Sequence, residues 1–206
     1  MTRIVLVRHA ETAWSGRRYC GRSDPPLGPE GRADADRLGA ELAGRLPAGA
    51  RIVTSPLARA RQTADEIAAA FDGPRVEVDS RWREADFGLV EGLTFAEIAR
   101  HRPDLAASLL LPDAAVDWPG GESHASLAGR VAAALGEVVH SGGTWIVVTH
   151  GGPLRLAVVL ATDVGFDRVA IPPPSGLVDL SIPIGRFDPA GSGPLGSPAW
   201  TEPAEA

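Results

Sequence analysis

The sequence predicts an α/β fold, built as a single-domain three-layer sandwich in which a mostly parallel sheet has helices on both faces. Short aliphatic segments alternate along the chain with longer segments whose apolar residues recur at helical spacing. A length of 206 residues is enough for one domain with a sizeable core and short for two. We therefore expect one domain over residues 1–187 and a flexible tail over residues 188–206, where glycine, proline and serine are frequent.

The first half of the chain contains three predicted strands and two predicted helices. Residues 3–7 form a short aliphatic run, which is typical of a buried strand. Residues 30–46 carry alanine and leucine at helical spacing. Residues 51–54 form a second aliphatic strand, and the apolar face of the next helix runs from Ala60 to Phe71. A weak third strand is predicted at residues 76–78.

The second half continues the alternation. Residues 94–111 are predicted to be helical, with a break at the proline within them. Residues 123–139 carry the clearest amphipathic pattern of the sequence. Residues 144–149 form an aliphatic strand, and an apolar helix is predicted to follow at residues 154–160. The alternation of apolar and polar residues over 177–184 predicts a late strand at an edge of the sheet.

The composition argues against several classes of function. A net charge of −6 argues against nucleic acid or an anionic membrane as a general partner, and no apolar run approaches the length of a membrane span. Charge follows the initial methionine too closely for a secretory signal. The lone cysteine, Cys20, cannot form an internal disulfide and favours a reducing, cytoplasmic setting. All 20 basic residues are arginine, which excludes lysine-dependent chemistry.

Polar residues follow three of the predicted strands at their carboxyl ends. Arg8 and His9 end the first strand, Arg59 lies shortly after the second, and His150 ends a later aliphatic strand. In an open α/β sheet these strand ends line the crevice that binds ligands. We therefore expect the two arginines and two histidines to meet in one pocket, next to Glu84 in a charged stretch.

This set of side chains suits a phosphoryl group. Arginine binds phosphate oxygens with a planar fork and stays charged, and a neutral imidazole is a competent nucleophile. Glu84 is the candidate that protonates the leaving oxygen, because a bound phosphate should raise its pKa; Asp86 is the alternative. The turn at Gly151, which opens a helix, offers backbone N–H groups to an anion.

Four ordered blocks of sequence resemble the signature of the histidine phosphatase, or phosphoglycerate mutase-like, superfamily. The first runs from Arg8 to Trp14 and reads Arg-His-Ala-Glu-Thr-Ala-Trp. The blocks follow the family's order and span residues 3 to about 160. The other blocks are Ser55 to Ala64, Glu84 with Phe87-Gly88 and Glu91-Gly92, and Thr149 to Gly152, and Pro119 to Ser123 resembles a fifth.

The resemblance implies that His9 is the nucleophile that becomes phosphorylated, and that Glu84 is the proton donor and later the base for water. It implies neither a metal nor an organic cofactor. Ser15 stands where the family usually has a phosphate-binding asparagine, and it can still donate one hydrogen bond. The resemblance also assigns phosphate-binding roles to Arg8, Arg59 and His150, and substrate-binding roles to Ser15 and to backbone groups at Cys20, Gly21 and Gly151.

Several candidates have structural alternatives. Arg59 could be a solvated helix arginine like Arg61, but helical spacing lets only one of the two face the pocket. Glu122 and Ser123 are predicted to form a helix N-terminus. The other histidines, His101, His124 and His140, are predicted to be solvated surface residues.

The expected function is metal-independent hydrolysis of small phosphomonoesters through a phosphohistidine on His9. The expected partner is a small phosphorylated metabolite, with neither nucleic acid nor membrane, and a homodimer is an open possibility. Mutases of the family carry a longer, more basic insertion between Gly92 and Trp118, so the short segment here favours hydrolysis. The resemblance extends to the α-ribazole-phosphate phosphatase and broad-specificity branches. Mutase-type phosphoryl transfer and a non-catalytic phosphate-binding relative are the alternatives.

Overall fold

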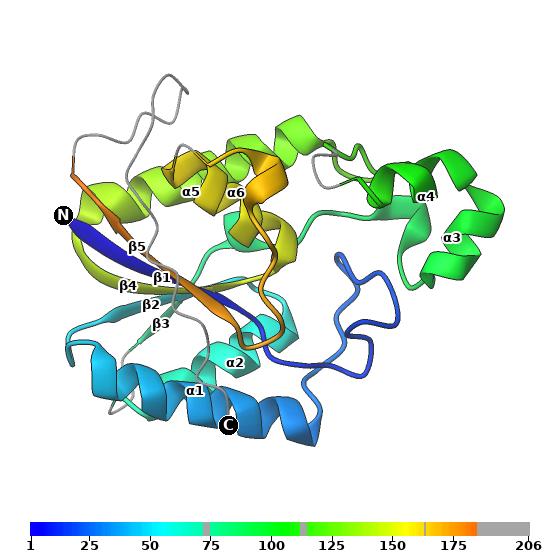
Figure 1. The fold of residues 1–206 in the computed structure, drawn as a ribbon. Coiled ribbons are helices and arrows are strands. Elements are labelled where there is room, and N and C mark those ends of the chain that lie inside the picture. The colour runs from blue at the N-terminus through cyan, green and yellow to red at the C-terminus, as the bar shows by residue number, and fades with distance from the viewer. Residues whose placement is uncertain (72–74, 112–114, 163, 185–206) are drawn as a thin grey trace.

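The computed structural model describes residues 1–71, 75–111, 115–162 and 164–184. The predicted flexible tail at residues 188–206 lies outside these described residues. Within them, the chain forms a sheet that is covered by helices on both faces (Figure 1). The predicted single-domain α/β sandwich is thereby confirmed.

The sheet consists of β1 (Thr2–Arg8), β2 (Arg51–Thr54), β3 (Val76–Val78), β4 (Gly143–Thr149) and β5 (Leu177–Ile182), in the order β3-β2-β4-β1-β5. β3, β2, β4 and β1 run parallel to one another, and β5 pairs antiparallel with β1. β5 lies at the sheet edge, as the alternating sequence predicted. In the register of β1 and β4, Arg8 lies opposite Thr149. The residues that follow these two strands therefore emerge side by side.

Two helices cover each face of the sheet (Figure 1). α1 (Pro29–Arg45) and α2 (Ala58–Ala69) lie on one face, and α5 (His124–Ser141) and α6 (Gly151–Ala161) lie on the other. Successive residues of β1 belong to different cores: Val5 packs with apolar residues of α1 and α2, whereas Leu6 packs with those of α5 and α6. Burial on both faces explains why β1 and β4 have nearly continuous apolar sequences.

A smaller helical pair extends beyond the carboxyl edge of the sheet (Figure 1). α3 (Phe95–His101) and α4 (Pro103–Leu109) are separated where the sequence predicted, because proline is accommodated in the first turn of a new helix. Thr94 and Glu97 cap α3 reciprocally. The pair packs on a small core of its own, formed by Val90, Ile98 and Ala106.

α6 begins at Gly151 and not at the predicted residue 154. The sequence did not indicate this start, because Gly151 and Gly152 have no apolar side chains to extend the helical pattern. Pro153 fits in the first turn, where the backbone nitrogen makes no intrahelical hydrogen bond. The short 3-10 helices η1 (Ser80–Trp82), η2 (Gly88–Val90) and η3 (Phe166–Arg168) complete the regular structure of the described ranges. No helix in those ranges is long and apolar enough to cross a membrane.

Candidate active site

His9 lies immediately after β1 and is 7% exposed. Its Nδ1 is 2.7 Å from the carbonyl oxygen of Ala10, so Nδ1 carries the ring proton and Nε2 carries the lone pair. Nε2 lies 3.2 Å from Nε of Arg59, which donates to it. Burial, and then the charges of Arg59 and Arg8, lower the pKa of His9 to about 3. The imidazole is therefore neutral, and thus nucleophilic, at neutral pH.

Arg59 stands in the first turn of α2, and its side chain is fully buried beside His9. The other end of its guanidinium donates to three carbonyl oxygens of one loop, those of Ser23 at 2.7 Å, Gly21 at 2.8 Å and Cys20 at 3.3 Å. Arg61 is exposed on the other side of the helix. Helical spacing thus places the two arginines on different sides of α2, and Arg59 is the one that contacts His9.

His150 follows β4 and is completely buried, with its ring centroid 5.0 Å from that of His9. Its Nε2 lies 2.7 Å from Oγ of Ser55, at the end of β2. Within the described residues, Nδ1 of His150 and Nε of Arg8 are buried and lack a protein hydrogen-bond partner. Burial, followed by the charge of Arg59, places the pKa of His150 well below its ordinary value. Arg8 also lines the cavity, so its free Nε is suited to meet an oxygen-rich ligand, whereas His150 lies behind His9 and not in the cavity lining.

Glu84 is buried between η1 and η2 and lines the same cavity as His9. Its carboxyl group accepts from the N–H of Ala85 at 3.0 Å and from that of Gly152 at 3.3 Å. Burial raises the pKa of Glu84 despite these hydrogen bonds and the nearby arginines. The alternative acid, Asp86, is not among the residues that line the cavity; it pairs with Arg22 at 3.2 Å. Of the two candidate acids, Glu84 is therefore the one that lies at the cavity.

Arg130 of α5 holds the Glu84 segment in place. Its guanidinium donates to the carbonyl oxygens of Arg81 and Arg83 at 2.6 Å each and of Glu84 at 3.1 Å. Glu122 pairs with this arginine at 2.8 Å, and Ser123 caps α5. The prediction of a helix N-terminus at this point agrees with that cap. The role of Arg130 was not predicted, because its sequence neighbours show only an amphipathic helix.

The loop after His9 contributes Ser15 and Cys20 to the cavity wall. Oγ of Ser15 accepts from the N–H of Thr12 at 3.0 Å, so this serine also closes a local turn. The thiol of Cys20 donates to the carbonyl oxygen of Ser23 at 3.4 Å, and burial raises its pKa. Gly151, at the start of α6, lines the cavity as well.

The prediction that the N–H of Gly21 faces a bound phosphate needs correction. This N–H donates to Oε2 of Glu91 at 3.1 Å. The same carboxylate accepts from the N–H groups of Arg22 and Ser23 and from the hydroxyl group of Ser23. A Cβ at position 21 would lie 2.4 Å from the carbonyl oxygen of Ala85, so the loop requires glycine here. Glu91 was a motif residue in the sequence, but nothing there indicated this contact.

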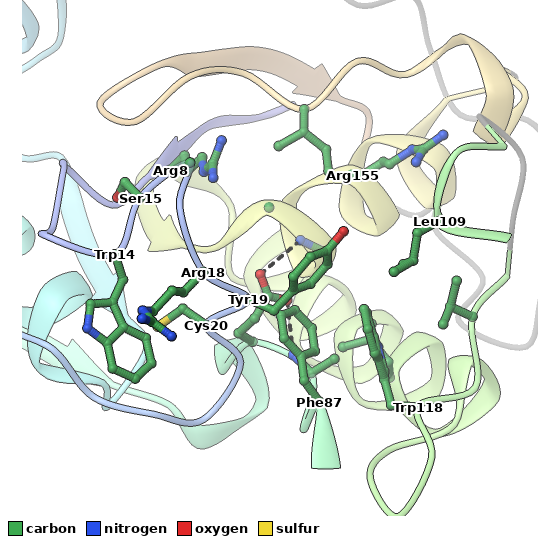
Figure 2. Close-up of a pocket in the computed structure, with 18 of the residues that line it drawn as sticks. Arg8, Trp14, Ser15, Arg18, Tyr19, Cys20, Phe87, Leu109, Trp118 and Arg155 are labelled. Carbon is green, nitrogen blue, oxygen red and sulfur yellow. Dashed lines mark hydrogen bonds between the residues drawn. The ribbon is translucent and has the colours of Figure 1, made fainter. Parts of the chain in front are cut away.

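The cavity has a volume of about 590 Å³, and Arg8 and Leu109 of α4 lie on different sides of it (Figure 2). His124 lies in its lining and makes an edge contact with Phe166, with ring centroids 5.5 Å apart. The expectation that His124 is a plain surface residue is therefore wrong, because α5 begins at this cavity. Within the described residues, no group of three or more His, Cys, Asp or Glu side chains could hold a metal.

Sequence relatives of known name match most of the chain. The bifunctional protein Rv2228c of Mycobacterium tuberculosis is 39% identical over 167 residues, which cover 80% of this chain and 45% of that protein. The chain thus spans about half the length of this relative. Phosphoglycerate mutase-like protein 4 of Arabidopsis thaliana is 36% identical, with 74% of this chain and 67% of that protein covered. A probable phosphoglycerate mutase GpmB of Salmonella paratyphi C is 33% identical over 80% of this chain and 76% of its own length.

Solved structures share the fold. A mycobacterial glucosyl-3-phosphoglycerate phosphatase aligns with a TM-score of 0.76 and 29% identity, over 86% of this chain and 88% of that one. YhfR of Bacillus stearothermophilus aligns with a TM-score of 0.80 and 31% identity, over 91% of this chain and 95% of its own. The sequence profile of the histidine phosphatase superfamily, branch 1, matches residues 4–178. The chain therefore belongs to branch 1 of the histidine phosphatase superfamily.

Proposed function

We propose that the protein hydrolyses small-molecule phosphomonoesters without a metal, through a phosphohistidine formed on Nε2 of His9. The observation that carries the proposal is the pairing of a neutral His9 with Glu84 in one buried pocket. The hydrogen bond from Nδ1 to Ala10 leaves the lone pair on Nε2, where it accepts from Arg59, and His9 lines the cavity. Arg8, Arg59 and His150 surround that nitrogen and can neutralise phosphoryl oxygens.

The first step transfers the phosphoryl group to the enzyme. On binding, a phosphoryl oxygen replaces Nε2 as an acceptor for Arg59. Nε2 of His9 forms a bond to phosphorus while the bond from phosphorus to the leaving oxygen breaks. Glu84 gives its proton to that oxygen, so the product leaves as an alcohol and Glu84 becomes a carboxylate. Burial raises the pKa of Glu84, which favours the protonated acid that this step requires.

The second step releases phosphate. The carboxylate of Glu84 takes a proton from water as the water oxygen attacks phosphorus. The bond between phosphorus and Nε2 breaks, which restores the lone pair of His9 and the proton of Glu84. Inorganic phosphate is the product, and the site is ready for another substrate.

Two kinds of relative bear on the choice of reaction. The fold and sequence similarity to a mycobacterial glucosyl-3-phosphoglycerate phosphatase supports hydrolysis. Relatives named phosphoglycerate mutases support a transfer that returns the phosphoryl group to the dephosphorylated molecule at another hydroxyl group. The product of any turnover of 3-phosphoglycerate, however slow, separates the two reactions, because hydrolysis releases inorganic phosphate whereas a mutase yields 2-phosphoglycerate.

Release of p-nitrophenol from p-nitrophenyl phosphate in the presence of EDTA tests the proposal. The wild-type protein should hydrolyse the ester, and His9→Ala should lower the rate of hydrolysis to that of the uncatalysed background. His140→Ala is the matched control, since His140 lies on α5 with Nδ1 2.6 Å from the carbonyl oxygen of Gly136. Activity that disappears in EDTA and returns with a divalent metal would contradict the proposal, as would an active His9→Ala variant.

A further inference from the structure

The pocket is much larger than a phosphoryl group requires. Its volume of about 590 Å³ falls in the range of sites that enclose a whole drug-sized ligand. The polar residues of the proposed reaction occupy its inner end, at the ends of β1 and β4. The remaining space therefore belongs to the part of the substrate that leaves as the alcohol.

One side of this outer half is apolar and aromatic. Tyr19, Phe87 and Trp118 are half-buried and gather on one side, with Leu109 of α4 beside them and Arg8 away from them (Figure 2). The rings of Phe87 and Trp118 are 4.0 Å apart between centroids, and Tyr19 lies about equally far from both, at 6.1 and 6.2 Å. Mutual packing fixes these rings before any substrate binds, which favours a flat or bulky apolar group.

The outer half is lined by arginines as well as by aromatic rings. Among the described residues that line the cavity, Glu84, at the inner end, is the one acidic residue. Three outer arginines belong to the lining: Arg17 is exposed, Arg18 donates to the carbonyl oxygen of Gly92, and Arg155 donates to that of Phe166 while stacking over its ring. A leaving group that packs against Phe87 and Trp118 therefore meets aromatic rings, and two of the three guanidinium groups already donate to carbonyl oxygens.

We propose that the aromatic subsite, formed by Tyr19, Phe87, Leu109 and Trp118, binds the leaving group, and that the preferred substrates are phosphomonoesters of bulky, ring-bearing alcohols. Small, multiply charged esters such as phosphoglycerate are then poor substrates. This inference rests on the proposed phosphatase activity and names the substrate class for the same site. Apolar contacts that persist in the transition state raise kcat/KM, which makes the preference measurable.

The test compares 2-naphthylmethyl phosphate with n-propyl phosphate. Both esters release a primary alcohol, so the need for a proton from Glu84 is closely matched and the size of the apolar group is the main variable. The wild-type enzyme should show a kcat/KM at least about 10-fold higher for the naphthyl ester. Trp118→Ala and Leu109→Asn should bring this ratio close to one, mainly by lowering kcat/KM for the naphthyl ester.

Leu89→Ala is the control variant, since Leu89 is an exposed apolar residue of the same segment as Phe87 but does not line the cavity. It should retain the wild-type ratio. A wild-type ratio near or below one, a preference for 3-phosphoglycerate, or a ratio that neither wall variant changes would overturn the subsite. Failure of the phosphatase proposal looks different, because neither ester and no p-nitrophenyl phosphate would then be hydrolysed.

Discussion

At the scale of single residues, burial prepares the nucleophile and the acid together. The pKa of His9 falls to about 3 because a buried imidazolium is poorly solvated, and the pKa of Glu84 rises because a buried carboxylate is poorly solvated. Burial thus shifts both pKa values towards the uncharged forms, which are the forms that the proposed first step uses.

The role of Glu84 can be tested by leaving group and by pH. Glu84→Gln should lower kcat about 10²–10⁴-fold for alkyl phosphates, and much less for p-nitrophenyl phosphate, whose leaving group needs little protonation. In the wild type, kcat should fall as the pH rises through the elevated pKa of Glu84, because the proton donor is lost. The pKa of His9 is about 3, so protonation of His9 should not lower kcat at pH values well above 3. The measurement is a pH–rate profile on both ester types.

The matched control is Asp86→Asn, because Asp86 neighbours Glu84 but pairs with Arg22. It should retain the alkaline limb that Glu84→Gln removes. If Glu84→Gln slows alkyl and aryl esters equally, or if the alkaline limb persists without Glu84, the acid must be assigned elsewhere.

At the scale of elements, the parallel pairing of β1 with β4 builds the centre of the site. The register that sets Arg8 against Thr149 delivers His9 and His150 to adjacent positions, although 141 positions separate them in the chain. The loop at residues 20–23 is then held from two directions. Arg59 of α2 donates hydrogen bonds to its carbonyl groups, and Glu91 accepts hydrogen bonds from its N–H groups.

Glu91 should therefore act as a positioning residue for Arg59 and the loop. Glu91→Ala leaves several N–H groups without their acceptor, so we expect a loss of about 2 kcal/mol or more in the free energy of unfolding and a lower kcat/KM. Glu91→Gln keeps one amide oxygen and should recover part of both. Urea unfolding and steady-state kinetics measure the two effects.

Glu97→Ala is the control for Glu91, since the Glu97 carboxylate also accepts backbone and hydroxyl donors but caps α3 and contacts no residue of the loop. It should lower stability modestly and leave kcat/KM close to wild type. Equal kinetic losses in the two variants would show that the loop needs no such fixation.

At the scale of the whole molecule, the sequence predicts the helices and strands well. It predicts poorly the contacts between side chains that are distant in the sequence. Apolar periodicity is local, so β1, α5 and the break before α4 follow from the residues themselves. The placement of Arg8, His9, Arg59, Glu84 and His150 in one site follows from strand ends and motif order. The hydrogen bond from Gly21 to Glu91, the support from Arg130 and the position of His124 depend on side chains that meet only after the layers have packed. No local pattern encodes those distances.

The helical pair α3 and α4 gives this molecule its particular pocket. The sandwich alone supplies the phosphoryl-binding residues at the strand ends, whereas Leu109 comes from the extension and Trp118 from the segment that returns to α5. Leu109 and Trp118 thus lie apart from the reacting residues, whereas Tyr19 and Phe87 belong to the segments that carry His9 and Glu84. Changes in the extension should alter which ester is preferred and leave the nucleophile and acid in place.

The most direct test of the central claim is to trap the phosphorylated enzyme. Rapid acid-free quenching of the wild type with ³²P-labelled substrate should place one phosphoryl group on the peptide that contains His9, and the label should be lost in acid and survive base, as a phosphoramidate does. His9→Ala should abolish the label, whereas His150→Ala should slow turnover and still allow labelling at His9. Label on the peptide that contains His150, or label that is stable in acid, would contradict the account.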